Sequence, residues 1–121
     1  LAQQVGVIKG ILWHQGESDS GNEDTAKIYE QQLHAMIAAW RKDLGNEKIP
    51  VVVGELGQFF KRAKHKSTVD NALKVLPNKV KHTAWVSSEG LGHKGDVVHF
   101  NAAAYREFGK RYASKIKSLQ E

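Results

Sequence analysis

Residues 5–19 have the sequence VGVIKGILWHQGESD, a nearly continuous apolar run followed directly by a dense polar loop. The apolar part, Val5 to Trp13, is rich in Val and Ile, which predicts a β-strand buried on both faces. Strands of this kind belong to parallel sheets whose two faces are covered by helices. The segment therefore predicts an α/β fold, with the polar loop at the carboxyl end of a strand.

Apolar residues at helical spacing predict two helices in the middle of the chain. The first has Asp24 as its expected N-cap and Gly45 as its expected C-terminal stop. The second is short, and Ser67 and Asp70 have the spacing of a capping box. Its expected end is Pro77, because proline cannot continue a helix.

Two further strands and a last helix complete the pattern. Val51 to Leu56 predicts a second buried strand, and the more polar, alternating run Val80 to Val86 predicts a third strand near an edge of the sheet. Asn101 is the expected cap of the last helix. The order is therefore β-α-β-α-β-α, with connections long enough for parallel strands. The expected buried face of the last helix consists of Tyr105, Phe108, Tyr112, Ile116 and Leu119.

The composition fits one domain with a packed core. Of its 121 residues, 40% are apolar, which argues against a disordered polyelectrolyte, and the net charge is +5. No apolar run approaches the ~18 residues of a membrane span, so we expect no membrane partner. The chain has no cysteine, which excludes a disulfide framework, a thiol nucleophile and a cysteine-ligated metal within it.

Three strands make a thin sheet, and the first strand has the apolar pattern of a central one. A central strand needs neighbours on both sides, so we expect residues 1–121 to form the C-terminal half of a larger α/β domain. The chain begins at Leu1 without a signal-like segment. The unpaired side of the first strand is a template for association, and we expect it to pair with a second copy or to leave the isolated chain marginally stable.

The strand-end loop GHKGDVVHFN, residues 92–101, contains the most informative pair of ionisable residues. A carboxylate at Asp96 can reach one ring nitrogen of His99 and fix its tautomer, which leaves the other nitrogen free to accept a proton from a nucleophile. The alternative interpretation is structural. Asp96 then caps a turn and His99 packs at the start of a helix.

Three other patterns predict no chemistry. Gly16 to Asp19 begins like a G-x-S-x-G nucleophile elbow, but position 20 is Ser, so we expect Ser18 to be a loop residue. The histidines and carboxylates lack a fixed ligand spacing such as H-E-x-x-H, so we expect no metal. The basic run Lys61 to Lys66 is expected to be a solvated loop rather than a nucleic-acid contact.

Residues 13–19, WHQGESD, resemble the W-x-Q-G-E-S-D block of the sialate O-acetylesterase and acetylxylan esterase group, the family six carbohydrate esterases of the SGNH hydrolase superfamily. Three further segments are similar to features of that family: Ala39 to Arg41, Pro50 to Leu56 and Asp96 to Phe100. The resemblance implies a three-layer αβα, flavodoxin-like fold with a parallel sheet. It also implies serine-type hydrolysis of acetyl esters on carbohydrates such as xylan or sialic acid, without a cofactor.

The same resemblance implies roles for five residues. His99 matches the general base and Asp96 its orienting partner. Gln15, with Gly16 beside it, matches the oxyanion or substrate-binding position, where a neutral amide N–H stabilises a developing oxyanion without attracting a proton. Glu17 matches the acid of the block, and we expect it to hold the loop. The resemblance further implies secretion or a periplasmic location.

The nucleophile block of the family, similar to G-x-S-N, does not occur in this sequence, nor does the block that carries the oxyanion glycine. We expect both upstream of Leu1, and we therefore expect this chain alone to be inactive. Two alternatives stay open. One is a non-catalytic carbohydrate-binding or scaffold remnant of the same fold, and the other is a basic nucleic-acid-binding α/β domain that uses Lys61 to Lys66.

Overall fold

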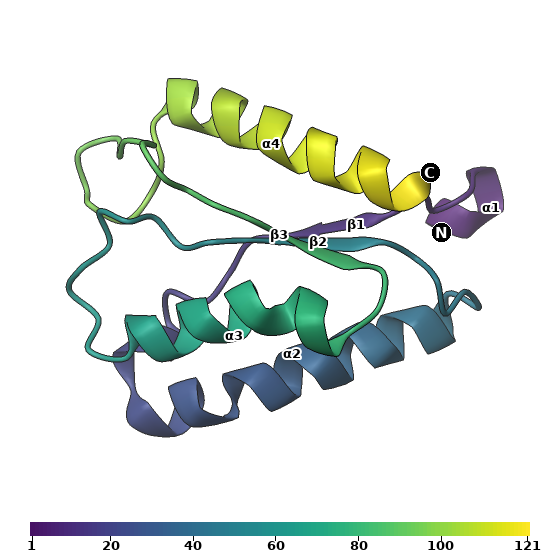
Figure 1. Cartoon of the computed structure of the whole chain (residues 1–121), viewed down its shortest axis with the longest axis horizontal. Helices are drawn as coiled ribbons and strands as arrows, with labels where there is room; N and C mark the ends of the chain where they lie inside the picture. Colours follow the sequence, from purple (N-terminus) through teal and green to yellow (C-terminus); the bar gives the residue numbers. More distant parts are fainter.

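The computed structural model describes residues 1–121 and confirms the predicted β-α-β-α-β-α order (Figure 1). Two short helical turns, α1 and η1, are added to the six expected elements. In chain order the elements are α1 (Ala2–Val5), β1 (Ile11–Trp13), the 3-10 turn η1 (Asp19–Gly21), α2 (Glu23–Asp43), β2 (Val51–Gly54), α3 (Lys66–Lys79), β3 (Thr83–Val86) and α4 (Ala102–Gln120).

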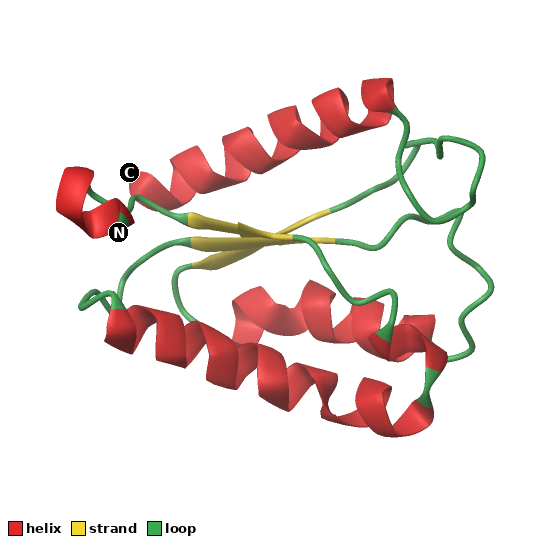
Figure 2. Ribbon diagram, turned by 180° about the vertical axis from the view of Figure 1, so that it is seen from behind, coloured by secondary structure: helices red, strands yellow, loops and turns green.

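The three strands form one parallel sheet in the order β1-β2-β3. Ile11 pairs with Val51, which in turn pairs with Thr83. Helices α2 and α3 cover one face of the sheet, and α4 covers the other (Figures 1 and 2). The predicted α/β class, with a parallel sheet between two helical layers, is therefore confirmed.

The central strand β2 is buried along its whole length because helices cover both of its faces. Val51 and Val53 pack into the larger core cluster with α2 and α3, whereas Val52 packs with α4. A Cβ on Gly54 would overlap the Tyr112 hydroxyl of α4. Glycine at this position therefore lets α4 pack directly against the end of the strand.

The first predicted strand is much shorter than expected. Only Ile11–Trp13 is extended, and Ala2–Val5 forms a helical turn instead. In this chain β1 is an edge strand, so the expectation of burial on both faces is wrong for it. Leu12 is 58% exposed and Val7 77% exposed, because no strand or helix of residues 1–121 covers them. That a longer sheet continues beyond β1 stays a prediction.

The N-terminal caps of the first two long helices also differ from the prediction. Asn22, and not Asp24, caps α2, because its side chain accepts hydrogen bonds from the N–H groups of Asp24 and Thr25. The predicted Ser67–Asp70 capping box of α3 does not form. Asp70 instead accepts the N–H of Leu56 from the strand-end loop, at 3.0 Å.

The C-terminal ends of α2 and α3 and the features of α4 agree with the prediction only in part. Gly45 has a φ of +69° just after α2, as expected of a C-terminal stop. Helix α3 runs through Pro77 and ends two residues later, at Lys79. Asn101 caps α4 as predicted, accepting the N–H of Ala104. Tyr105 is 50% exposed rather than buried, because it lies beyond the end of the sheet at the rim of a cavity.

Candidate active site

Three loops meet beyond the carboxyl ends of the strands, one after each strand (Figure 2). They enclose an open cavity of about 650 Å³. This is the edge where ligands bind in open parallel sheets. The side chains that line the cavity include His14, Glu17 and Ser18 from the first loop, Arg62 from the second, and His99 and Phe100 from the third.

The predicted contact between Asp96 and His99 is confirmed. His99 Nδ1 lies 2.6 Å from Asp96 Oδ2, while Asp96 Oδ1 accepts the N–H groups of Val98 at 3.0 Å and His99 at 2.8 Å. The hydrogen bond from the His99 ring, followed by these two N–H groups, holds the pKa of Asp96 well below its usual range. An ionised Asp96 places the ring proton on Nδ1, which leaves the lone pair of Nε2 available to accept a proton.

Gln15 lies at the same edge of the sheet as His99, as predicted, but its amide is turned away from the large cavity. Gln15 Nε2 donates to Asp19 Oδ2 at 2.6 Å. Together with Trp13 and Asp19 it lines a separate, smaller cavity of about 100 Å³. The structure therefore does not bring the Gln15 amide and the His99 ring together, and the oxyanion role stays a prediction.

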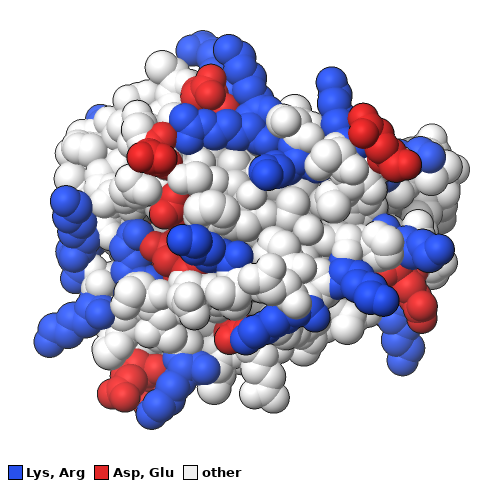
Figure 3. Space-filling model, in the orientation of Figure 1, with Lys and Arg blue, Asp and Glu red and all other residues white.

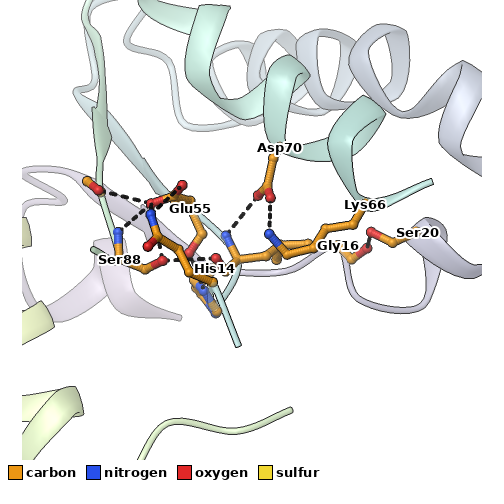
Figure 4. Close-up of polar contacts among 10 residues, drawn as sticks. His14, Gly16, Ser20, Glu55, Lys66, Asp70 and Ser88 are labelled. Carbon is orange, nitrogen blue, oxygen red and sulfur yellow. Dashed lines mark hydrogen bonds and ion pairs between the residues drawn. The ribbon is translucent and has the colours of Figure 1, made fainter. Parts of the chain in front are cut away.

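The loop after β1 is held by contacts that the sequence did not indicate. Ser20, which is fully buried, donates its hydroxyl to the carbonyl of Gly16 at 2.7 Å (Figure 4). Tyr29 donates to the carbonyl of Gln15 at 2.8 Å, and burial raises the pKa of Tyr29 to about 12, which keeps this hydroxyl a donor. Glu17, which was expected to hold the loop, makes no hydrogen bond or ion pair and faces the cavity.

Gly16 has a conformation that favours glycine, with a φ of +143°. A Cβ at this position would lie 2.7 Å from Cγ1 of Val69 on α3. Glycine therefore lets the first loop lie directly against α3.

Glu55 directly follows β2, at the edge of the sheet where the large cavity lies, and the sequence did not indicate its contacts with the loop after β3. Its Oε2 accepts the N–H of Ser88 at 2.7 Å, the hydroxyl of Ser87 at 3.0 Å and the hydroxyl of Ser88 at 3.1 Å (Figure 4). Burial alone would raise the pKa of Glu55, but these hydrogen bonds, with another from Gln58, outweigh burial and lower it. The carboxylate thus ties the loop after β2 to the loop after β3.

His14 joins the first loop to the other two. Its Nε2 lies 3.2 Å from the carbonyl oxygen of Glu55, so Nε2 carries the proton and donates. The ring makes edge contacts with Phe100 and Phe108, with centroids 5.5 Å apart in both cases. The position of this histidine, directly after a predicted strand, was visible in the sequence, but its partners lie too far away in the sequence to be predicted.

The basic run after β2 divides between two places. Arg62 lines the large cavity, whereas Lys61 and Lys64 line a different one. Lys66 forms an ion pair with Asp70. Figure 3 shows Lys and Arg side chains distributed over the visible face, with acidic side chains between them. The face therefore presents no continuous basic stripe.

No group of three or more His, Asp or Glu side chains lies close enough together to hold a metal ion. No helix has the length and apolar character needed to cross a membrane.

The three-layer arrangement, with a parallel sheet between two helical layers, is that of an SGNH-like α/β domain, and an Asp–His pair lies in its last strand-end loop. Residues 1–118 match the family described as "Carbohydrate esterase, sialic acid-specific acetylesterase", and the chain belongs to this family. The recognised block at residues 13–19 and the pair at Asp96 and His99 both lie within the matched region.

Two comparisons place the chain beside a plant protein. A probable carbohydrate esterase of Arabidopsis thaliana is 26% identical over 116 residues, which cover 93% of this chain and 42% of that protein. The X-ray structure of an Arabidopsis thaliana protein matches with a TM-score of 0.83 and 27% identity, covering 93% of this chain and 45% of that one. The chain thus spans less than half the length of the relatives it matches.

Proposed function

We propose that the protein of which this chain is part hydrolyses acetyl esters on carbohydrates by a serine mechanism, and that this chain supplies the general base and its orienting acid. The observation that carries the proposal is the 2.6 Å contact between Asp96 and His99 at the rim of the large cavity. Membership of a carbohydrate esterase family supports the reaction class.

In this mechanism a serine hydroxyl attacks the acetyl carbonyl while His99 Nε2 takes the hydroxyl proton. The tetrahedral intermediate collapses, and the same proton passes to the departing sugar oxygen. Water then attacks the acetyl-serine, again with His99 as base, and releases acetate. Asp96 keeps the ring in the reactive tautomer and stabilises the imidazolium that forms. No serine of this chain forms a hydrogen bond with His99, so we propose that the nucleophile lies outside residues 1–121.

The test uses the longer protein that contains this chain, with an acetylated sugar as substrate. His99→Ala should lower kcat by at least about 10³-fold, because the base is lost. Gln15→Ala should lower kcat by about 10²–10³-fold if its amide completes the oxyanion hole in the whole enzyme. His34→Ala, which changes a histidine on α2 outside the cavity, is the matched control. Full activity of the His99 variant would overturn the proposal.

The isolated chain should behave differently. We expect residues 1–121 to hydrolyse p-nitrophenyl acetate no faster than their own His99→Ala variant. Turnover well above that control, abolished by Ser18→Ala, would show that the nucleophile is Ser18, which lines the same cavity as His99.

Arg62 favours an acidic sugar as the substrate within this class. Its guanidinium lies 5.8 Å from the centre of the Phe60 ring, and both side chains line the cavity that contains His99. A guanidinium supported on an aromatic ring is a suitable partner for a sugar carboxylate. Arg62→Gln should therefore raise KM for an acetylated acidic sugar and leave a neutral one unchanged. Lys64→Gln, on the same loop but outside this cavity, serves as control.

A binding role without catalysis remains the second candidate for the chain by itself. The observation that favours it is the Gln15 amide, which is engaged by Asp19 rather than directed at the cavity. Binding of acetylated and deacetylated sugars with equal affinity, by a longer protein that lacks esterase activity, would support this alternative.

Self-association through β1 is our proposal for the isolated chain. The strand has a partner on one side only, and its central residue, Leu12, is 58% exposed. Leu12→Lys should lower the fraction of dimer in sedimentation experiments, whereas Ile28→Lys, at an exposed position on α2, should not. A purely monomeric wild-type chain would contradict this proposal.

A further inference from the structure

His93 lies six residues before His99 in the same loop and does not line the large cavity. Its ring packs against Phe59, with ring centroids 5.2 Å apart, and its backbone forms an isolated antiparallel bridge with Phe100. The residue is thus fixed on both sides, by a side chain of the second loop and by the backbone that follows His99.

The ring of His93 accepts hydrogen bonds from the backbone of its own loop. Nδ1 lies 2.9 Å from the N–H of Gly95 and 3.4 Å from the N–H of Val97, the two residues that flank Asp96. A backbone N–H can only donate, so Nδ1 must carry a lone pair. The proton of the neutral ring is therefore on Nε2.

The backbone between His93 and His99 is held in an unusual conformation. Val97 has a φ of +55°, which is a genuine outlier for a β-branched residue, and Gly95 has a φ of +118°. Such a conformation persists only where the surroundings over-determine it. The bonds from Gly95 and Val97 to His93 hold it from one side, and the 2.9 Å bond from Lys94 N to the carbonyl of His99 closes the loop.

The turn formed by the positive φ angles at Gly95 and Val97 determines which backbone N–H groups reach Asp96 in the candidate active site. Immediately after it, the N–H groups of Val98 and His99 donate to Asp96 Oδ1, which leaves Oδ2 directed at the His99 ring. An extended backbone at Val97 would carry these N–H groups away from the carboxylate. The contact between Asp96 and His99 therefore depends on the turn that His93 stabilises.

We propose that His93 is a positioning residue, whose neutral Nδ1 folds the loop so that Asp96 meets His99. The inference rests on the proposed function, because that function makes His99 the general base and Asp96 its orienting acid. It assigns opposite tautomers to two histidines of one loop, with the proton on Nε2 in His93 and on Nδ1 in His99.

Two substitutions test separately the Nδ1 acceptor of His93 and the packing of its aromatic ring. His93→Phe keeps an aromatic ring against Phe59 and removes the acceptor. His93→Asn removes the ring but keeps an oxygen close to the position of Nδ1, where asparagine commonly accepts the N–H two residues later. Long-range ¹H–¹⁵N correlation spectra of residues 1–121, recorded above the titration range of the histidines, report the tautomer of each ring.

We expect the wild-type chain to show the two opposite tautomers. In His93→Phe, His99 should lose its preference for the Nδ1–H form and approach the mixture of a free imidazole, and in His93→Asn it should keep the preference. A wild-type spectrum with the proton of His93 on Nδ1 would overturn the inference without any variant. Loss of the preference in both variants would also overturn it, because ring packing would then hold the loop.

Kinetics of the longer protein give a second readout. His93→Phe should lower kcat by about 10²-fold with a smaller effect on KM, since a misplaced base loses rate rather than affinity, and His93→Asn should restore most of the rate. If His99→Ala keeps full activity, the proposed function fails, while the tautomer of His99 in the His93 variants still decides whether His93 positions the pair.

Discussion

Replacement of Glu55 by Gln tests how the strand-end loops are held together. Glu55 directly follows β2, and its carboxylate accepts hydrogen bonds from Ser87 and Ser88, which follow β3. Ser88 is fully buried, so its N–H and hydroxyl have no access to water. Glutamine has the same shape and one remaining carbonyl oxygen, so the substitution removes the charge while it leaves the packing unchanged.

The magnitude follows from the geometry of these bonds. Hydrogen bonds to a charged group contribute about 1.5–3 kcal/mol each, and neutral ones about 1 kcal/mol. In the glutamine variant, the bond from Ser88 N, at 2.7 Å, and the bond from Ser87 Oγ, at 3.0 Å, would each contribute as a neutral hydrogen bond instead of a charged one. Glu55 is partly exposed, which weakens the charge effect. We therefore expect Glu55→Gln to lower the free energy of unfolding by about 2 kcal/mol.

The assay is urea unfolding at several pH values, with Glu47→Gln, an exposed glutamate without an ion pair, as control. The pKa of Glu55 is lower in the folded chain than the value of about 4.3 expected when it is unfolded. Its contribution is therefore fully present above pH ~4.3 and is lost as the pH falls through the lower, folded pKa. The difference between wild type and Glu55→Gln should shrink in acid. Equal stability at pH 7 would refute the reasoning.

Three further predictions concern other parts of the fold. Arg41→Met should lower the free energy of unfolding by about 3 kcal/mol in urea titrations, because this buried guanidinium donates to three backbone carbonyls near the start of β2 and β3. Gly54→Ala should cost about 1–3 kcal/mol by the same measurement, since the new methyl group overlaps the Tyr112 hydroxyl, and Gly54→Ala combined with Tyr112→Phe should recover part of the loss. Asp96→Asn in the longer protein should lower kcat by about 10³–10⁴-fold, and an unchanged kcat would leave this residue a loop cap only.

The alternation of apolar runs and helical periodicity was sufficient to predict the layered α/β fold. Val51 to Gly54 is uniformly apolar because both faces of β2 are covered, so the composition of this segment is sufficient to predict a buried strand. The boundaries of the helices were harder to predict than the helices themselves. Asn22 caps α2 in place of Asp24, because both residues can accept backbone N–H groups and only the path of the preceding loop selects one of them.

Within the candidate active site, the sequence by itself determined the contact between Asp96 and His99. The two residues are three positions apart, so a local turn is sufficient to bring them together, and the residue types predict the contact without showing what holds that turn. The same holds for Asn101 and Ala104 at the start of α4. Short separations leave few conformations that satisfy the hydrogen bonds, and a pattern of residue types can therefore predict them.

Only the tertiary structure decided the contacts that join the loops. Glu55 meets Ser88 across 33 residues, His14 meets the Glu55 carbonyl across 41, and Tyr112 donates to the carbonyl of Trp13 across 99. Closure of such long loops costs chain entropy that no local pattern records, and the packing of helices on both faces of the sheet compensates for that cost. The direction of the Gln15 amide and the turn at Val97 likewise depend on neighbours that only the folded chain supplies.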